Sequence, residues 1–172
     1  MVDSNHEPDQ DLTGTQAVEV LRDIVMAANT CMMVTQHETF PFDVRPMGAQ
    51  GVDDSGTVWF LSAADSGKNR DIERDARVTL LVQDNSHYQY AQVSGSATIH
   101  RDKALIDKYW SAVANAWFDG KDDPRVTLLA VHPETGQYWK TKNGKVVTGV
   151  RMLLSAAGAN VDEGGVHGQL RV

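Results

Sequence analysis

Residues 59–70 contain the groups best suited to bind a phosphate. Their pattern predicts a strand that ends at Ser62, a tight loop, and a helix that begins near Ser66. The first turn of a helix presents unpaired N–H groups and a partial positive charge, so it attracts anions. Ser62 and Ser66 would add hydroxyl donors there, and Lys68 and Arg70 would add positive charge. The alternative interpretation is a capped surface helix with solvated charges, and the stretch is not a Walker A loop.

A second cation, Arg45, precedes Pro46 in the sequence. A residue before proline avoids the helical region, so residues 43–52 are expected to be extended. A charged side chain is a poor core residue. Arg45 is therefore either a charge at a sheet edge or a ligand for an anion.

Other reactive patterns are missing from the sequence. Cys31 is the single cysteine, which excludes a disulfide framework and any zinc site that needs two or more cysteines. His132-Pro133-Glu134 matches half of the zinc deaminase pattern, and the half that contains two cysteines is missing. No Gly-x-Ser-x-Gly elbow occurs. We expect Cys31 to be buried and inert, with no metal site and no identifiable catalytic residue.

Length and composition indicate the class of protein. The chain has 172 residues, of which 41% are hydrophobic and 23% charged, and this suits one globular domain. A formal net charge of -7 argues against a partner that is a nucleic acid. No apolar run approaches the ~18 residues that span a membrane, and no signal peptide opens the chain. These features predict a soluble cytoplasmic protein with no membrane partner.

Hydrophobic periodicity predicts the elements that must position these residues. A helix follows a capping box formed by Thr13 and Gln16, and further helices are expected at 66–75 and after Asp102. The chain should hold six or seven strands, drawn from the extended runs 30–36, 43–52, 57–62, 77–83, 88–100, 126–131, 136–140 and 146–154. A bulge is expected between Tyr90 and Val93, and Asn143-Gly144 predicts a hairpin turn. The spacing favours a closed or nearly closed antiparallel barrel.

Composition divides the chain into three parts. Residues 1–12 are acidic and poor in apolar groups, so they are expected to form a disordered arm. Residues 13–154 should form the barrel domain. Residues 155–172 are rich in Gly and Ala and are expected to form a flexible tail.

Five segments, in their order and spacing, resemble the FMN-binding split-barrel proteins of the pyridoxamine 5'-phosphate oxidase-like superfamily, and in particular its bacterial general stress protein branch. The resemblance covers roughly residues 30–154, and the segments are Arg45-Pro46-Met47, 59–69, 76–82, 93–97 and 137–140. It implies a mainly β, Greek-key split barrel with flanking helices. It also implies a homodimer that binds FMN in clefts between the subunits.

The resemblance also assigns roles by position. Arg45, Ser62, Ser66 and Lys68 would hold the FMN phosphate. The isoalloxazine ring would be bordered by Met47, Leu61, Gln89 and Tyr90, with Pro46 among the binding positions and Trp139 approaching from the partner subunit.

The function implied is that of an FMN-binding general stress protein, a flavin-dependent oxidoreductase acting on an unidentified small molecule. The chain ends in Gln169-Leu170-Arg171-Val172 rather than in the Arg-Leu-x-Pro signature of true pyridoxamine-phosphate oxidases, so oxidation of vitamin B6 is not expected. A flavin-binding or flavin-buffering module without turnover is the alternative. It is motivated by the lack of a catalytic acid, base or nucleophile beside the proposed site.

Overall fold

The structure, a computed structural model, describes residues 10–141 and 165–172. Within them, eight strands form one sheet in the order β1-β8-β7-β4-β3-β2-β5-β6. The strands are β1 (Leu12–Thr13), β2 (Thr30–Thr35), β3 (Asp43–Val52), β4 (Val58–Ala63), β5 (Arg77–Asp84), β6 (Gln89–His100), β7 (Val126–Thr141) and β8 (Gly165–Arg171). The helices are α1 (Gly14–Ala28), α2 (Gly67–Arg74), α3 (Lys103–Tyr109) and the short 3-10 helix η1 (Ala112–Ala116).

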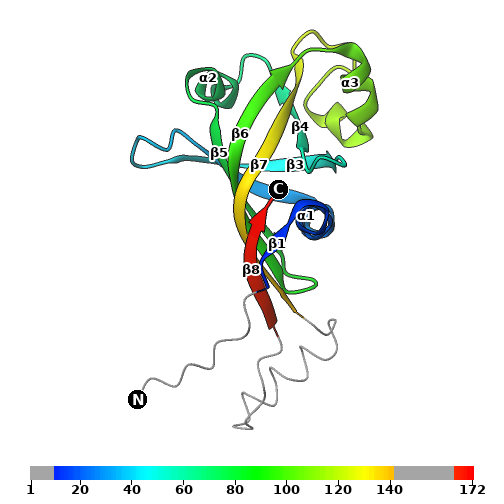
Figure 1. Ribbon diagram of the computed structural model, residues 1–172. Coiled ribbons are helices and arrows are strands. Elements are labelled where there is room, and N and C mark those ends of the chain that lie inside the picture. Colours follow the sequence, from blue (N-terminus) through cyan, green and yellow to red (C-terminus); the bar gives the residue numbers. More distant parts are fainter. Residues whose placement is uncertain (1–9, 142–164) are drawn as a thin grey trace, which may run out of the picture.

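An additional pairing between β6 and β7 closes strands β2 to β7 into a barrel, as Figure 1 shows. Strands β2, β3 and β4 follow one another as an antiparallel meander, and the chain then passes through α2 so that β5 lies beside β2. This is a Greek key. The predicted mainly β, antiparallel split barrel with flanking helices is therefore confirmed.

β7 is one long strand where the sequence predicted two. Its first half pairs with β4 and its second half with β8, while β6 accompanies it along most of its length. The register shifts at Ser94 and Gly95, where Thr135 and Pro133 are the partners and Glu134 has none. A bulge of this kind accommodates Pro133, because a proline cannot donate to a regular ladder. It also lies slightly beyond the predicted position between Tyr90 and Val93.

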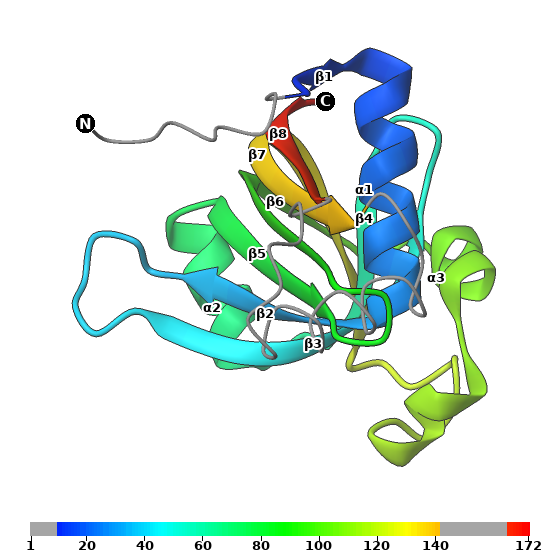
Figure 2. The ribbon, with the colours of Figure 1, turned by 90° about the horizontal axis from the view of Figure 1, so that it is seen from below.

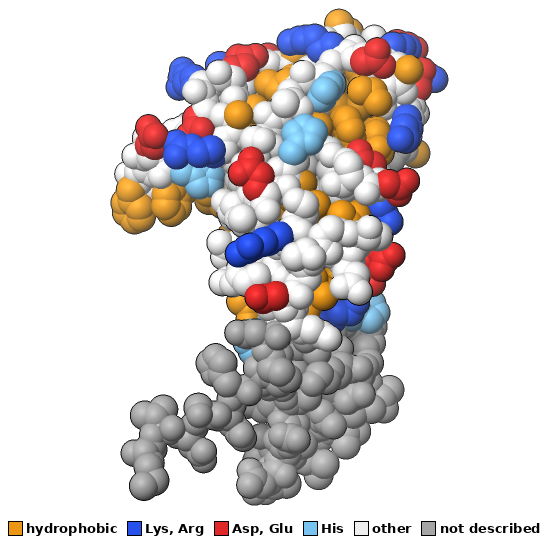
Figure 3. All heavy atoms as spheres, viewed as in Figure 1, with side chains coloured by type: hydrophobic (Ala, Val, Ile, Leu, Met, Phe, Trp, Pro, Cys, Tyr) orange, Lys and Arg blue, Asp and Glu red, His pale blue; other side chains and the backbone are white. Residues whose placement is uncertain are grey.

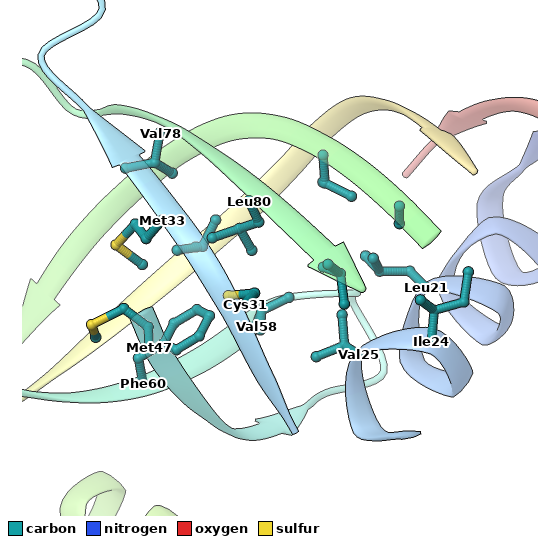
Figure 4. Packing of buried hydrophobic residues seen from close by; sticks show 14 of the residues in the cluster. Leu21, Ile24, Val25, Cys31, Met33, Met47, Val58, Phe60, Val78 and Leu80 are labelled. Carbon is teal, nitrogen blue, oxygen red and sulfur yellow. The ribbon is translucent and has the colours of Figure 1, made fainter. Parts of the chain in front are cut away.

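The main core fills the barrel and continues under α1. The face of α1 that packs on the strands carries Ala17, Val18, Leu21, Ile24 and Val25. Figure 4 shows Leu21, Ile24 and Val25 of α1 at one end of the core and the strand residues Met33, Phe60 and Leu80 in the barrel. Met33, Phe60 and Leu80 each have 0% exposure. Cys31 is buried in this core as expected, and its burial raises the pKa of the thiol to about 12.

A second apolar cluster lies on the other side of β4 and β7, under α3 and η1 (Figure 1). Trp59 belongs to it, and its ring stacks on Tyr109 with the centroids 4.7 Å apart. Asp102 caps α3 as predicted, by accepting a hydrogen bond from Leu105 N. At the start of α1, Thr13 occupies the N-cap position but its side chain makes no capping hydrogen bond, so the predicted capping box is wrong.

The structure corrects both predicted tails. Residues 165–171 were expected in a flexible tail but form β8, because the second half of β7 offers a free edge after β4 has ended. Leu12 of the expected arm pairs in parallel with Leu170, and Tyr138 Oη donates to Gln10 O at 2.8 Å. Figure 2 shows β1 and β8 side by side. The predicted strand 146–154 and the Asn143-Gly144 turn lie outside the described residues.

The described residues contain neither a helix fit to span a membrane nor a cluster of metal ligands. None of their helices is long and apolar enough to cross a membrane. Residues 10–141 and 165–172 also contain no group of three or more His, Cys, Asp or Glu side chains that could hold a metal ion.

Candidate functional site

The hydroxyl groups of Ser62 and Ser66 meet at the start of α2, where β4 ends and the helix begins. Ser66 is the N-cap and accepts a hydrogen bond from Asn69 N. Asn69 Oδ1 accepts from Ser62 Oγ at 2.6 Å and from Ser66 Oγ at 3.1 Å. Asn69 Nδ2 in turn donates to Thr127 Oγ1 on β7 at 3.1 Å. Asn69, which is 1% exposed, therefore holds both hydroxyls in position.

Arg45 reaches the same helix from β3. Its guanidinium donates to Thr35 Oγ1 at 2.8 Å and lies 3.3 Å from Asp71 Oδ2 on α2, and it also contacts Asp43. Burial acts to raise the pKa of Asp71, but hydrogen bonds from Thr35 and Gln36, together with the Arg45 charge, outweigh it, so the pKa is lowered. Asp71 is therefore an anchor that fixes Arg45 against α2.

Lys68 lies in the first turn of α2 and is partly buried. Burial lowers the pKa of its ammonium group, the charge of Arg45 lowers it further, and Asp65 acts in the opposite direction. Among the described residues its Nζ atom has no hydrogen bond and no ion pair. A cation that is partly desolvated, repelled by a second cation and without a paired anion creates an attractive site for an external anion. We call Arg45, Ser62, Ser66 and Lys68 the cradle.

The residues predicted to border a flavin ring have different surroundings within one chain. Met47 is buried in the barrel core, Pro46 faces outward on β3, and Leu61 packs against the Trp59 cluster. Tyr90 and Trp139 are direct partners across β6 and β7. Pro46, Met47 and Leu61 adjoin Arg45 and Ser62 of the cradle in the sequence, whereas Tyr90 and Trp139 come from other strands.

Gln89 precedes Tyr90 and carries a buried acceptor that is not used within the described residues. Its Nε2 donates to Asp84 Oδ2 at 3.1 Å, whereas its Oε1 has no hydrogen-bond partner. Thr79 on β5 pairs with Val34, the neighbour of Thr35, and so lies toward the cradle. Gln83 on β5 pairs with Tyr90, the neighbour of Gln89, and so lies toward the other end of the strand. The two positions are four residues apart, or about 13 Å along a strand. Within one chain, Gln89 and the cradle lie at opposite ends of the sheet.

Among residues 10–141 and 165–172, no charged side chain lies across the centre of the outward side of the sheet. Met32 on β2 pairs with Pro46 on β3 and with Leu81 on β5. Leu81 in turn pairs with Gln92 on β6, and Gln92 pairs with Gln137 on β7. Met32 and Leu81 remain 39% and 42% exposed. We call this surface the uncharged face, and it comprises Thr30, Met32, Val44, Pro46, Gly48, Thr79, Leu81, Gln83, Tyr90, Gln92, Ser94, Gln137 and Trp139. Beyond it, the hairpin between β2 and β3 ends in hydrophobic side chains, visible in Figure 3.

Four residues that organise the cradle were missed by the sequence analysis: Thr35, Asn69, Asp71 and Thr127. Asn69 had a local signal, since it lies three residues after the N-cap serine. Thr35, Asp71 and Thr127 had none, because their contacts depend on how α2 docks against the barrel.

Comparison with known proteins gives one family and several relatives. A family model described as pyridoxamine 5'-phosphate oxidase like matches residues 16–162. General stress protein 26 of Bacillus subtilis (strain 168) is 33% identical over 84 residues, which are 47% of this chain and 60% of that protein. The match thus spans less than two thirds of that relative. Protein bli-3 of Neurospora crassa is 26% identical over 162 residues, which are 86% of this chain and 78% of that protein.

Solved structures show the same fold. A crystal structure named as general stress protein 26 from Jannaschia sp. CCS1 has a TM-score of 0.72 and 23% identity, and the match covers 92% of this chain and 96% of that one. The general stress FMN/FAD binding protein from Xanthomonas citri has a TM-score of 0.63 and 26% identity, with 76% of this chain and 92% of that one covered.

Proposed function

The chain belongs to the pyridoxamine 5'-phosphate oxidase-like family, and on that premise we propose that it binds FMN, with the phosphate in the cradle. The observation that carries the proposal is Lys68, a partly buried cation with no paired anion among the described residues. A relative from Xanthomonas citri is named an FMN/FAD binding protein, which supports a flavin as the ligand. Similarity to general stress protein 26 supports a role in the stress response.

The donors of the cradle fit a phosphate monoester. The N-terminus of α2 supplies a partial positive charge, and Lys68 supplies an ammonium group with no paired anion among the described residues. Ser62 and Ser66 donate their hydroxyl protons to Asn69 Oδ1, so each hydroxyl would have to turn away from that acceptor to donate to a phosphate. Arg45 is partly neutralised by Asp71 and Asp43. We therefore assign most of the charge recognition to Lys68, and positioning to Arg45.

The proposed ring site requires a second copy of the chain. The unused Oε1 of Gln89 is an acceptor suited to a ring N–H, and Tyr90 and Trp139 offer flat aromatic surfaces. Gln89 and Tyr90 lie at the other end of the sheet from the cradle of their own chain. We propose that the partner subunit supplies Trp139 to the ring, in a homodimer with two flavins.

The uncharged face is the surface we propose for this dimer. Charged residues are depleted at the centre of protein interfaces. Exposed apolar patches on a protein surface often mark such interfaces. Met32, Val44 and Leu81 are each about 40% exposed on this face, at 39%, 43% and 42%. Trp139 lies on the same face, so docking through it brings Trp139 toward the partner.

FMN, when bound, supplies hydride and electron transfer. We propose a flavin-dependent oxidoreductase that acts on a small molecule. The second candidate is a module that stores flavin without turnover, and it is favoured by the engagement of Asp71, whose carboxylate already accepts hydrogen bonds from Thr35, Gln36 and Arg45. Oxidation of NADH or NADPH by the purified holoprotein, dependent on bound FMN, would establish the first and contradict the second.

Calorimetric titration of the full chain with FMN and with riboflavin tests the phosphate site. Lys68→Ala should weaken FMN binding roughly 10- to 150-fold, which corresponds to the loss of one charge-assisted contact of about 1.5–3 kcal/mol. Riboflavin has no phosphate, so its affinity should not change. Arg70→Ala is the matched control, because Arg70 is exposed and donates to Asp65 O. Equal losses for FMN and riboflavin would show that the phosphate is not bound at Lys68.

A further inference from the structure

Two histidines on neighbouring strands converge on a single hydroxyl group, on a side of the barrel separate from the cradle. His100 Nε2 lies 2.8 Å from Thr98 Oγ1, and His132 Nε2 lies 3.1 Å from the same oxygen. Both imidazoles therefore point at one small volume. Figure 3 shows histidine side chains close together on the exposed surface over the upper ends of β6 and β7.

The strand register explains this convergence. His132 pairs with Ser96 across β6 and β7, and side chains alternate between the faces of a strand. Ser96, Thr98 and His100 therefore share the face on which His132 lies. Thr98 and His132 are exposed, so a dissolved ion can reach the two rings.

His132 is held in place from its other ring nitrogen. Its Nδ1 lies 3.3 Å from Thr57 Oγ1. Thr57 is 4% exposed, and Asp53 Oδ1 accepts from its backbone N–H at 3.0 Å. With the Nδ1 proton assigned to this contact, His132 Nε2 presents a lone pair toward Thr98.

His100 is held in place by its ring. It packs on the indole of Trp59, with the centroids 5.6 Å apart. The indole N–H of Trp59 donates to Asp53 Oδ2 at 2.9 Å. Asp53 thus steadies the surroundings of both histidines, through Thr57 on one side and Trp59 on the other.

We propose that His100 and His132 together bind a divalent late first-row transition metal ion, with Cu²⁺ bound most tightly. Imidazole nitrogen suits copper, nickel and zinc, and affinities for such ligands rise to Cu²⁺ and fall again at Zn²⁺. A modest rotation of the Thr98 side chain lets both Nε2 atoms reach the ion, and water fills the remaining positions. Two protein nitrogens are fewer than the three or four of a resident zinc centre, so this is an open site whose ion exchanges.

The test uses the full-length protein with CuCl₂, followed by calorimetry and by electron paramagnetic resonance. We expect one Cu²⁺ per chain above the background of weak sites, with hyperfine splitting from two imidazole nitrogens. His100→Gln and His132→Gln should each remove the two-nitrogen signal and weaken binding roughly tenfold or more. His87→Gln, which changes a histidine at the other end of β6, is the control and should change neither. Wild-type affinity and spectrum in both the His100 and His132 variants would overturn the proposal.

The Thr57→Val variant tests whether Thr57 positions the His132 ring for metal binding. It leaves both imidazoles in place and removes the oxygen that faces His132 Nδ1. We expect the two-nitrogen spectrum to remain while the affinity for Cu²⁺ falls about 10- to 100-fold. Binding must also weaken on acidification, because protons compete with the metal ion for the imidazoles. An affinity for Cu²⁺ that does not change between neutral and acidic buffer would contradict histidine ligation.

Discussion

Arg45 and Asp71 lie 3.3 Å apart, although 26 positions separate them in the sequence. The contact joins β3, which contributes Arg45 to the cradle, to α2, which contributes Lys68. Thr35 and Gln36 donate to the same carboxylate at 2.9 Å and 2.7 Å. One acidic side chain therefore aligns two cations with each other.

We expect Asp71→Asn to lower the free energy of unfolding by about 1.5–3 kcal/mol, the range for hydrogen bonds to a charged group. The Asp71 side chain is only 5% exposed, so water cannot replace the lost partner. Urea unfolding at neutral pH measures the change. Asp75→Asn at the end of the same helix is the control, since Asp75 pairs with the exposed Arg77 and should matter little.

This effect should depend on pH. The pKa of Asp71 is lowered in the folded protein, so the stabilisation is fully present above the ordinary aspartate pKa of about 3.9 and is lost as the pH falls through the lower folded value. The stability difference between wild type and Asp71→Asn should shrink in that acid range. A difference that stays constant there would show that the carboxylate charge is not the cause.

Lys68→Met should stabilise the protein when no flavin is bound. The pKa of Lys68 is lowered, so the cost of holding its charge is fully present below the folded pKa and is relieved as the pH rises through it. We expect the melting temperature at neutral pH to rise by about 1–4 °C, since 1 kcal/mol shifts it by that order. The gain should shrink in alkaline buffer, and excess FMN should reverse the order of the two proteins. Arg70→Met is the control and should show no gain.

Gly95→Ala should destabilise the barrel by about 1–3 kcal/mol, because overpacking forces the backbone to shift. A Cβ atom at Gly95 would lie 2.0 Å from His132 O on β7. Gly48→Ala is the matched control, since its Cβ would meet nothing closer than Gln50 Nε2 at 3.8 Å. That change should be neutral or stabilise by about 0.4–1 kcal/mol. Thermal unfolding measures both variants. Equal melting temperatures for Gly95→Ala and Gly48→Ala would contradict the close approach of Gly95 to the β7 backbone.

Leu81→Arg should convert the proposed dimer into monomers, because it places a charge at the centre of the uncharged face. Light scattering should then give the monomer mass of 18.9 kDa. FMN affinity should fall with it if the partner supplies Trp139. Met26→Arg is the control, since Met26 has a similar exposure of 38% but lies on α1. A wild-type protein that is already monomeric would refute the assembly.

Local patterns predicted the barrel well. The sequence predicted a helix that begins near Ser66 after a strand and a tight loop, and α2 begins at Gly67 with Ser66 as its N-cap. Antiparallel order followed from the short connections between strands. Asn143-Gly144 and the strand after it stay predictions, because they lie outside the described residues.

Contacts between distant segments could not be predicted in this way. Pro133 and Gly136 read as a break between two strands, but a bulge beside Gly95 lets β7 continue through them. β8 has a Gly-rich sequence that resembles a tail, and it is ordered by the edge of β7 rather than by its own pattern. Asp71 looked like an ordinary helix carboxylate, since its partners come from β2 and β3.

Thr127, which supports the cradle, is translated after the cradle residues themselves. This side chain accepts from Asn69 and donates to Ser62 O at 2.8 Å, so it supports residues made some sixty positions earlier. A nascent chain folds as it emerges from the ribosome, beginning with its N-terminal part. The serines and lysine of α2 emerge long before the strand that fixes them. Until β7 has been translated, the growing chain carries the proposed ligands of the phosphate without the support that aligns them. If the cradle binds FMN as we propose, loading of the cofactor would have to wait for that strand.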